Sequence, residues 1–105
     1  CMGSLGDHFP DTDPKYKHAD SLDLMDHVMN LVRNRSYELV NVDTTIVTEE
    51  PKLKPIIDTI RLKLASRMGL DIQDLSVKAT TSEKMGFIGH LEGMAVHAVV
   101  LLKKQ

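Results

Sequence analysis

The sequence predicts an α/β (α+β) two-layer sandwich, with helices packed on one face of a mixed sheet. Hydrophobic residues make up 42% of the 105 residues and charged residues 27%, a balance typical of globular proteins. Segments with helical periodicity alternate with strand-like segments, and the last two strand-like segments follow each other directly. We expect one domain over residues 1–105.

Residues 1–18 are rich in glycine, proline and aspartate, which favour turns, so a loop is expected there. A helix should follow, with Asp20 or Ser21 as its N-cap and cations such as Arg35 near its end. One apolar stripe at helical spacing indicates its buried side: Leu22, Met25, Val28, Met29 and Val32.

The segment from Tyr37 to Thr48 alternates as a strand does. One face is apolar apart from Thr44 and is predicted to carry Val40, Val42 and Ile46. The other face is of mixed polarity and should meet solvent or another subunit. That second face would hold Leu39, Asn41, Asp43, Thr45 and Val47.

A second helix is predicted from about Leu53 to Met68, with Gly69 just beyond its end. Its buried stripe would be Ile56, Ile57, Ile60, Leu64 and Met68. A short strand from Leu75 to Thr80 and a glycine-bearing turn region lead to a last strand, Met94 to Leu102. Because that strand is apolar on both faces apart from His97, we expect it to be central or covered on both sides.

The composition excludes several classes of protein. A formal net charge of -2 offers no electrostatic footprint for nucleic acid. No apolar run approaches the roughly 20 residues of a membrane span. Cys1 is the single cysteine, so no internal disulfide can form, which suits a reducing compartment.

Four polar clusters at predicted loops and strand ends are candidate sites. The first, Asp7 to Pro14, holds three aspartates and His8, which could bind a divalent cation; the alternative is a turn-rich surface loop. The second, Thr48 to Pro55, combines free backbone N–H groups at a helix start with the charge of Lys52. Its alternative is a plain helix start whose acidic residues suit the helix dipole.

The third cluster, Lys78 to Lys84, has three hydroxyls and a carboxylate that could grip a diphosphate and its metal ion. The alternative is a capping box, since Thr80 and Glu83 have the required spacing. The fourth, Gly86 to Gly93, could form a pocket from Phe, His and Glu, or a tight turn between strands. No histidine pair has zinc spacing, and no nucleophile elbow, P-loop or dinucleotide fingerprint occurs.

The clusters in their joint order resemble the 2-C-methyl-D-erythritol 2,4-cyclodiphosphate synthase family over essentially the whole chain. The matching pieces are Phe9 to Pro14, Ala19-Asp20-Ser21, Asn41-Val42-Asp43, Glu50-Pro51-Lys52, Val77 to Phe87 and Glu92-Gly93.

The resemblance implies a homotrimer with active sites between subunits, located in the bacterial cytoplasm or the plastid stroma. It implies a metal-dependent phosphorus–oxygen lyase of the non-mevalonate isoprenoid route. The substrate would be 4-diphosphocytidyl-2-C-methyl-D-erythritol 2-phosphate, and the products 2-C-methyl-D-erythritol 2,4-cyclodiphosphate and CMP. The implied cofactors are zinc at one site and magnesium or manganese at the diphosphate.

The same resemblance assigns roles to residues. Thr81 would stabilise the transition state, and Glu83 would bind Mg²⁺ or Mn²⁺ between the α- and β-phosphates. Asp7, Phe9, Pro10, Asp11, Thr12 and Asp13 would bind the methylerythritol moiety. Thr48, Glu49, Glu50, Pro51, Lys52, Leu53 and Lys54 would bind cytidine, mainly through backbone groups. Thr80 and Thr81 would contact the nucleotide and its phosphates, and Ser82 and Glu83 would also bind substrate, with Phe87 and His90 further along the binding surface.

Some features depart from the family pattern. The zinc ligands, an Asp-x-His pair and another His, would lie upstream of this chain, so the chain as given is expected to lack that metal and to be inactive. The stretch between Asp7 and Phe9 is three residues short, His90 replaces an Arg and Ser82 replaces a Thr. The alternatives are a non-catalytic cytidine-nucleotide-binding trimeric domain and a plain interaction module.

Overall fold

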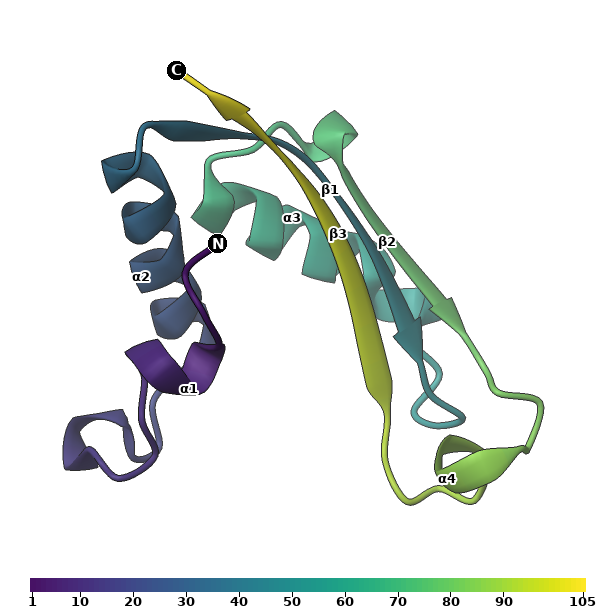
Figure 1. Ribbon diagram of the computed structural model, residues 1–105. Coiled ribbons are helices and arrows are strands. Elements are labelled where there is room, and N and C mark those ends of the chain that lie inside the picture. The colour runs from purple at the N-terminus through teal and green to yellow at the C-terminus, as the bar shows by residue number, and fades with distance from the viewer.

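The computed structural model describes all 105 residues and shows a three-stranded sheet with two long helices beside it (Figure 1). The strands are β1 (Tyr37–Val47), β2 (Leu75–Thr80) and β3 (Ala95–Lys104), and the long helices are α2 (Ser21–Asn34) and α3 (Ile57–Met68). The short helical segments are α1 (Leu5–His8), η1 (Pro14–Tyr16), η2 (Lys54–Ile56), η3 (Ile72–Asp74) and α4 (Gly86–Gly89). The predicted mixed sheet with helices is confirmed. None of the helices has the length and apolar character that crossing a lipid bilayer requires.

Local signals account for the helix ends. The Asp20 side chain accepts a hydrogen bond from the Leu22 N–H at 2.8 Å, which confirms the predicted N-cap of α2. Helix α3 ends at Gly69, whose φ of 66° lies in the left-handed region that glycine adopts freely. It begins four residues later than predicted, because residues 54–56 form η2 and Ile56, with φ of -116° and ψ of 2°, interrupts the helix before Ile57.

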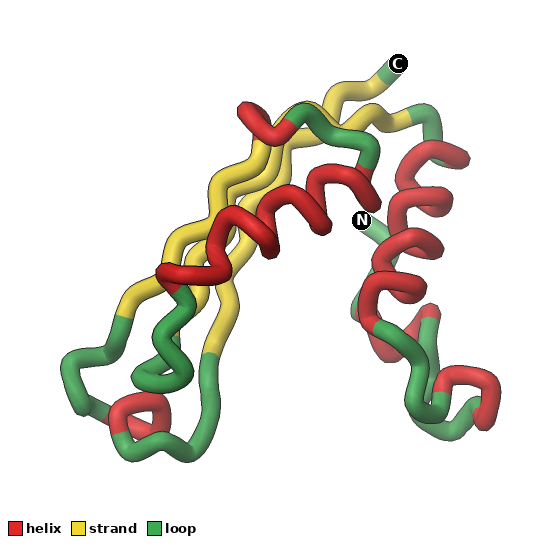
Figure 2. Tube along the Cα trace, turned by 180° about the vertical axis from the view of Figure 1, so that it is seen from behind, coloured by secondary structure: helices red, strands yellow, loops and turns green.

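Strands β1 and β2 pair in parallel, with Val42 opposite Leu75 and Val47 opposite Thr80. Parallel neighbours need a crossover, and α3 provides it along one face of the sheet (Figure 2). Arg61 of α3 donates to the carbonyl oxygens of Ile72 at 2.8 Å and Leu75 at 3.1 Å. The crossover helix is thereby tied to the start of β2.

Strand β3 pairs antiparallel with β1, so the sheet order is β2-β1-β3 and β1 is the central strand. The expectation that the last strand is central or covered on both sides is wrong for this chain. Strand β3 lies at the edge, and every residue after Ala95 is exposed. An apolar strand sequence indicates that its side chains are buried by packing partners, but not whether those partners belong to the same chain.

A β-bulge at Val40 changes the faces of β1. Leu39 pairs with Leu102, but Asn41 pairs with Leu101, so one residue of β1 is extra. Leu39 therefore joins Val42 on the helix side and packs against the core, and the predicted assignment of Leu39 to the opposite face is wrong. Strict alternation fails at a bulge because two residues on one strand oppose a single residue on its partner.

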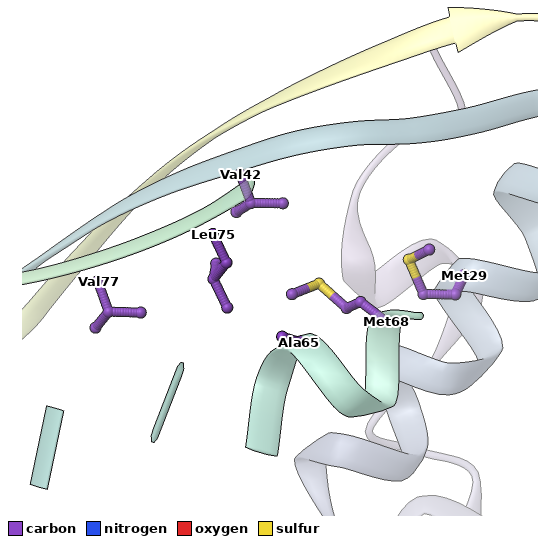
Figure 3. Packing of buried hydrophobic residues seen from close by; sticks show 6 residues of the cluster. All are labelled: Met29, Val42, Ala65, Met68, Leu75 and Val77. Atoms are coloured by element: carbon purple, nitrogen blue, oxygen red, sulfur yellow. The ribbon is translucent and has the colours of Figure 1, made fainter. Parts of the chain in front are cut away.

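The buried core is small and lies between α3, α2 and the sheet. Its six residues are Met29, Val42, Ala65, Met68, Leu75 and Val77 (Figure 3). Leu75, at the start of β2, is 2% exposed and the most buried of them. A core of this size makes each large member important to stability.

Helix α2 is held to α3 by an ion-pair network. Arg67 of α3 donates to the carboxylates of Asp26 at 2.7 Å and Asp23 at 2.9 Å, both on α2. Beside this contact an apolar groove of about 420 Å³ runs between α2, α3 and β3. Met25, Val28 and Val100 are among its lining residues.

Replacing Leu75 with alanine is expected to destabilise the protein by about 2–5 kcal/mol, because it removes a fully buried side chain and leaves a cavity. The matched control is Leu62→Ala on α3, where the side chain is 60% exposed and the change should cost under about 0.5 kcal/mol. Denaturant unfolding followed by circular dichroism measures both. Equal effects of the two substitutions would contradict this account of the core.

Asp26→Asn should lower stability at neutral pH, because the hydrogen bond from Arg67 holds the pKa of Asp26 below its usual value. A carboxyl with a depressed folded-state pKa stabilises the fold above its unfolded pKa of about 3.9. That contribution is lost as the pH falls through the lower, folded-state value. Urea unfolding across this range should show a difference from the parent protein at pH 7 that disappears in strong acid. Asp74→Asn, which breaks no ion pair, serves as the control.

Candidate functional site

The parallel pairing brings the second and third polar clusters together. Both follow the carboxyl ends of neighbouring strands, where ligands bind in open α/β sheets. The Thr48 N–H donates to the Thr80 carbonyl oxygen at 3.0 Å and extends the ladder one step beyond the strands. The two clusters therefore leave the sheet side by side.

A cavity of about 200 Å³ lies between these two segments. Its lining residues are Thr48, Glu49, Pro51, Lys52, Leu53, Lys54, Ala79, Thr80 and Thr81. Eight of the nine belong to the predicted site, and Ala79 is the addition. The cavity gathers ammonium groups, hydroxyls and backbone amides, all of which donate hydrogen bonds to an anion.

Several donors at this cavity have no partner in the chain. The backbone N–H groups of Lys52 and Leu53 donate to no other residue, and the Lys52 ammonium forms no ion pair. Thr48 differs, because it is 6% exposed and its hydroxyl donates to the Glu50 carbonyl oxygen at 2.7 Å. Thr48 thus shapes the loop, while the following residues offer free polar groups.

The third cluster forms a turn rather than a helix start. Helix α4 begins only at Gly86, so the capping-box alternative for Thr80 and Glu83 is wrong. The Glu83 N–H donates to Thr81 Oγ1 at 3.3 Å, which leaves the hydroxyl hydrogen of Thr81 free to donate to a ligand. The Glu83 carboxylate is exposed and takes part in no hydrogen bond or ion pair.

Glu49 links the two segments through its carboxylate. Its Oε1 accepts from the N–H groups of Ser82 and Lys84, each at 3.0 Å, and lies 3.2 Å from the Ser82 hydroxyl. The hydrogen bond from the Lys84 N–H, with that from Ser82, holds the pKa of Glu49 below its usual value. This link joins residues 33 and 35 positions apart, and no local sequence signal indicates it.

The fourth cluster borders a second cavity on the other side of the 48–51 segment. This cavity of about 380 Å³ lies between Thr48–Pro51 and the residues Ile88, Leu91, Gly93 and Met94. The predicted residues Phe87 and His90 line neither cavity, and both are exposed. Sequence analysis missed the apolar lining, although Ile88 and Leu91 have the i,i+3 spacing that places two side chains on one side of a turn.

The first cluster lies elsewhere. Figure 1 shows α1 and the loop that follows it beside α2, whereas α4 lies at the far end of the sheet. Asp7 accepts from the Ser4 N–H at 2.9 Å, which lowers its pKa, and Asp13 accepts from the Lys15 N–H at 3.1 Å. Phe9 packs edge-on against Tyr16, with ring centroids 5.3 Å apart. Within one chain these residues cap and pack, and Pro10, Asp11 and Thr12 of the same cluster are exposed.

The metals that the resemblance implies differ in how well the side chains of this chain could hold them. Nowhere in the chain do three His, Cys, Asp or Glu side chains converge as a metal site. A zinc site therefore does not fit the residues present. Magnesium is commonly held by one or two carboxylates together with substrate phosphates, and the free carboxylate of Glu83 beside the cavity fits that requirement.

Comparison with known proteins gives a consistent result. The model of the YgbB family matches residues 1–103. A 2-C-methyl-D-erythritol 2,4-cyclodiphosphate synthase of Ectopseudomonas mendocina is 52% identical over 104 residues, which span 99% of this chain and 66% of that protein. The Bacillus subtilis protein of the same name is 46% identical, over 99% of this chain and 69% of its own length. The chain thus spans about two thirds of the length of these curated relatives.

Solved structures share the fold. The bifunctional IspDF of Campylobacter jejuni superposes with a TM-score of 0.93 at 42% identity, over 98% of this chain and 28% of that one. IspF of Plasmodium falciparum, solved as a CDP complex, gives a TM-score of 0.83 at 25% identity, over 98% of this chain and 61% of that one.

Proposed function

This chain belongs to the YgbB family, and on that premise we propose that it is the larger part of a 2-C-methyl-D-erythritol 2,4-cyclodiphosphate synthase. Its substrate would be 4-diphosphocytidyl-2-C-methyl-D-erythritol 2-phosphate. The products would be the 2,4-cyclodiphosphate, an intermediate of the non-mevalonate isoprenoid route, and CMP. The names of relatives 46–52% identical to this chain support the proposal.

The observation that carries this proposal is the cavity between Thr48–Lys54 and Thr80–Thr81. One wall offers free backbone groups that can pair with the edge of a cytosine base, and the other offers hydroxyls suited to phosphate oxygens. A cytidine diphosphate needs both kinds of contact side by side. The P. falciparum relative was solved with that nucleotide.

The chemistry is a displacement at phosphorus. An oxygen of the 2-phosphate forms a bond to the β-phosphorus, the bond from that phosphorus to the α-phosphate oxygen breaks, and CMP leaves with the electron pair. Because two anionic groups must approach each other, catalysis requires positioning and charge stabilisation rather than a protein nucleophile. Lys52 would offset negative charge, and the free Thr81 hydroxyl would donate to an oxygen whose charge rises in the transition state.

Glu83 would hold a magnesium or manganese ion together with the α- and β-phosphates. Such an ion, when bound, neutralises phosphate charge and polarises the phosphorus–oxygen bonds. Within this chain the role of Glu83 depends on its position in the turn after β2, where its carboxylate remains free. No step is assigned to zinc, because no suitable group of side chains is present.

A homotrimer would complete the site. Asp7 and the segment Phe9–Asp13 lie beside α2 of their own chain. The methylerythritol moiety would therefore contact the same residues of a neighbouring subunit. Strand β3 supports this proposal, since its Val99 and Leu101 are 73% and 54% exposed on the sheet face that carries no helix. Burial of these side chains against another copy would provide the hydrophobic stabilisation that the single chain lacks.

A second candidate function is cytidine-nucleotide binding without catalysis. The cavity with its free backbone N–H groups would serve this function as well. The two candidates share the cavity and differ in whether the phosphorus–oxygen bond is broken.

The test is CMP release from the substrate by the gene product that contains this chain, with Mg²⁺ and Zn²⁺ present. The parent protein should release CMP, and Thr81→Ala should lower kcat by about 10²–10³, as the loss of one transition-state hydrogen-bond donor does. Thr81→Ser keeps the hydroxyl and should retain most of the activity. Ser66→Ala, on the distant end of α3, is the control.

The outcomes separate the candidates. CDP binding without CMP release would support the second candidate and exclude the first. If the protein neither bound CDP nor released CMP, both would be excluded, and the chain would be an interaction module.

For the trimer, Val99→Lys should convert a trimeric species to monomers, because it places a charge in the proposed apolar contact. Leu62→Lys, at a position on α3 that is 60% exposed, should leave the trimer intact. Sedimentation equilibrium of the three proteins gives the masses. A parent protein that remains monomeric at high concentration would refute the trimer.

A further inference from the structure

Glu49 lines the cavity, and its carboxylate accepts hydrogen bonds from the backbone of the 82–84 turn. One of its oxygens accepts two N–H groups, from Ser82 and Lys84, each at 3.0 Å. The Ser82 hydroxyl lies 3.2 Å from the same oxygen and 2.8 Å from the Met85 carbonyl oxygen, and its single proton can serve one of them at a time. The two N–H bonds are therefore the constant part of the contact, here named the Glu49 clasp.

The backbone that the clasp holds is strained. Glu83 and Lys84 have φ values of 55° and 65°, in the left-handed region that residues with a Cβ rarely adopt. An anion that accepts the Ser82 and Lys84 N–H groups together stabilises this turn. On the other side Gly89 of α4 lies so close to the Lys84 backbone that any side chain at position 89 would overlap it. The turn is thus fixed between α4 and Glu49.

We infer that Glu49 is a positioning residue, which sets the 82–84 turn, and with it Thr81 and Glu83, at a fixed place opposite Lys52. This inference rests on the proposed function and assigns Glu49 a role other than the substrate contact that the family resemblance implied.

Charge supports this role over direct contact with the diphosphate. A carboxylate in the wall of a diphosphate site would repel the ligand unless its charge were already satisfied. The two N–H donors satisfy it, and they also keep the pKa of Glu49 low, so the clasp remains ionised at neutral pH. Fixing the turn before the ligand arrives reduces the ordering cost of binding, which is the usual way in which a supporting residue raises affinity.

The test compares the affinities of CDP and CMP, each with Mg²⁺, for the parent protein and three variants by calorimetry. Glu49→Ala should weaken CDP binding about tenfold or more and CMP binding much less, since CDP presents two phosphates to the ion that Glu83 would hold and CMP presents only one. Glu49→Gln keeps a carbonyl oxygen that accepts N–H groups and should restore most of the CDP affinity. Asp74→Ala removes the same charge at the opposite end of β2 and should change neither affinity.

Two further measurements separate positioning from direct contact and from misfolding. In a Thr81→Ala background, Glu49→Ala should cost much less CDP affinity than in the parent, because it acts through the same turn. In the protein without ligand, the amide proton shifts of Ser82 and Lys84 should move in Glu49→Ala and remain close to the parent values in Glu49→Gln. Unchanged amides elsewhere show that the fold is intact.

The results distinguish the inference from the proposed function. If the parent protein binds CDP, the inference is overturned by unchanged CDP affinity in Glu49→Ala or by an equal loss for CMP. If the parent protein does not bind CDP, the proposed function fails, and the amide shifts alone decide whether Glu49 fixes the turn. Unmoved Ser82 and Lys84 amides would then overturn the clasp as well.

Discussion

The parallel pairing of β1 with β2 is the constraint on which the rest of the structure depends. Because the strands run the same way, Thr48 and Thr80 leave the sheet as neighbours, and the candidate cavity forms between the loops that follow. The register is set by burial. A slip of one residue would turn Lys78 into the core and Val77 out to solvent, at a large cost in free energy. The same core that stabilises the crossover helix thus fixes the geometry of the site.

Elements with their own local signals could be predicted from the sequence. Asp20 caps α2 and Gly69 ends α3 as expected, because a cap acts within one turn of the helix it ends. The place of β3 in the sheet and the bulge at Val40 could not be predicted. Both depend on which strand pairs with which, and apolar content on two faces is equally compatible with a central strand and an uncovered edge.

In the candidate site, too, features with a local sequence signal could be predicted, whereas contacts between distant segments could not. The third cluster was identified by residue type, but its position beside the second depends on the parallel pairing of β1 with β2, which residue types do not indicate. The Glu49 clasp could not be predicted, because its donors are backbone N–H groups 33 and 35 positions away, whose directions depend on the conformation of the 82–84 turn. The first cluster shows that suitable residue types alone do not establish a binding site. Asp7 and Asp13 have suitable chemistry, yet within the chain each accepts a hydrogen bond from a nearby backbone N–H.

Two carboxylates in neighbouring segments therefore have different tasks because their surroundings differ. Two backbone N–H groups donate to the Glu49 carboxylate and partly offset its negative charge, so Glu49 adds little repulsion toward an anionic ligand. Glu83 sits at the apex of the turn that Glu49 holds, exposed and without a partner, so its charge remains available to a cation. A site for a diphosphate with its metal ion requires both: a fixed turn, and a free carboxylate upon it. The left-handed backbone that exposes Glu83 is strained, and the hydrogen bonds of the Glu49 clasp offset that strain energy.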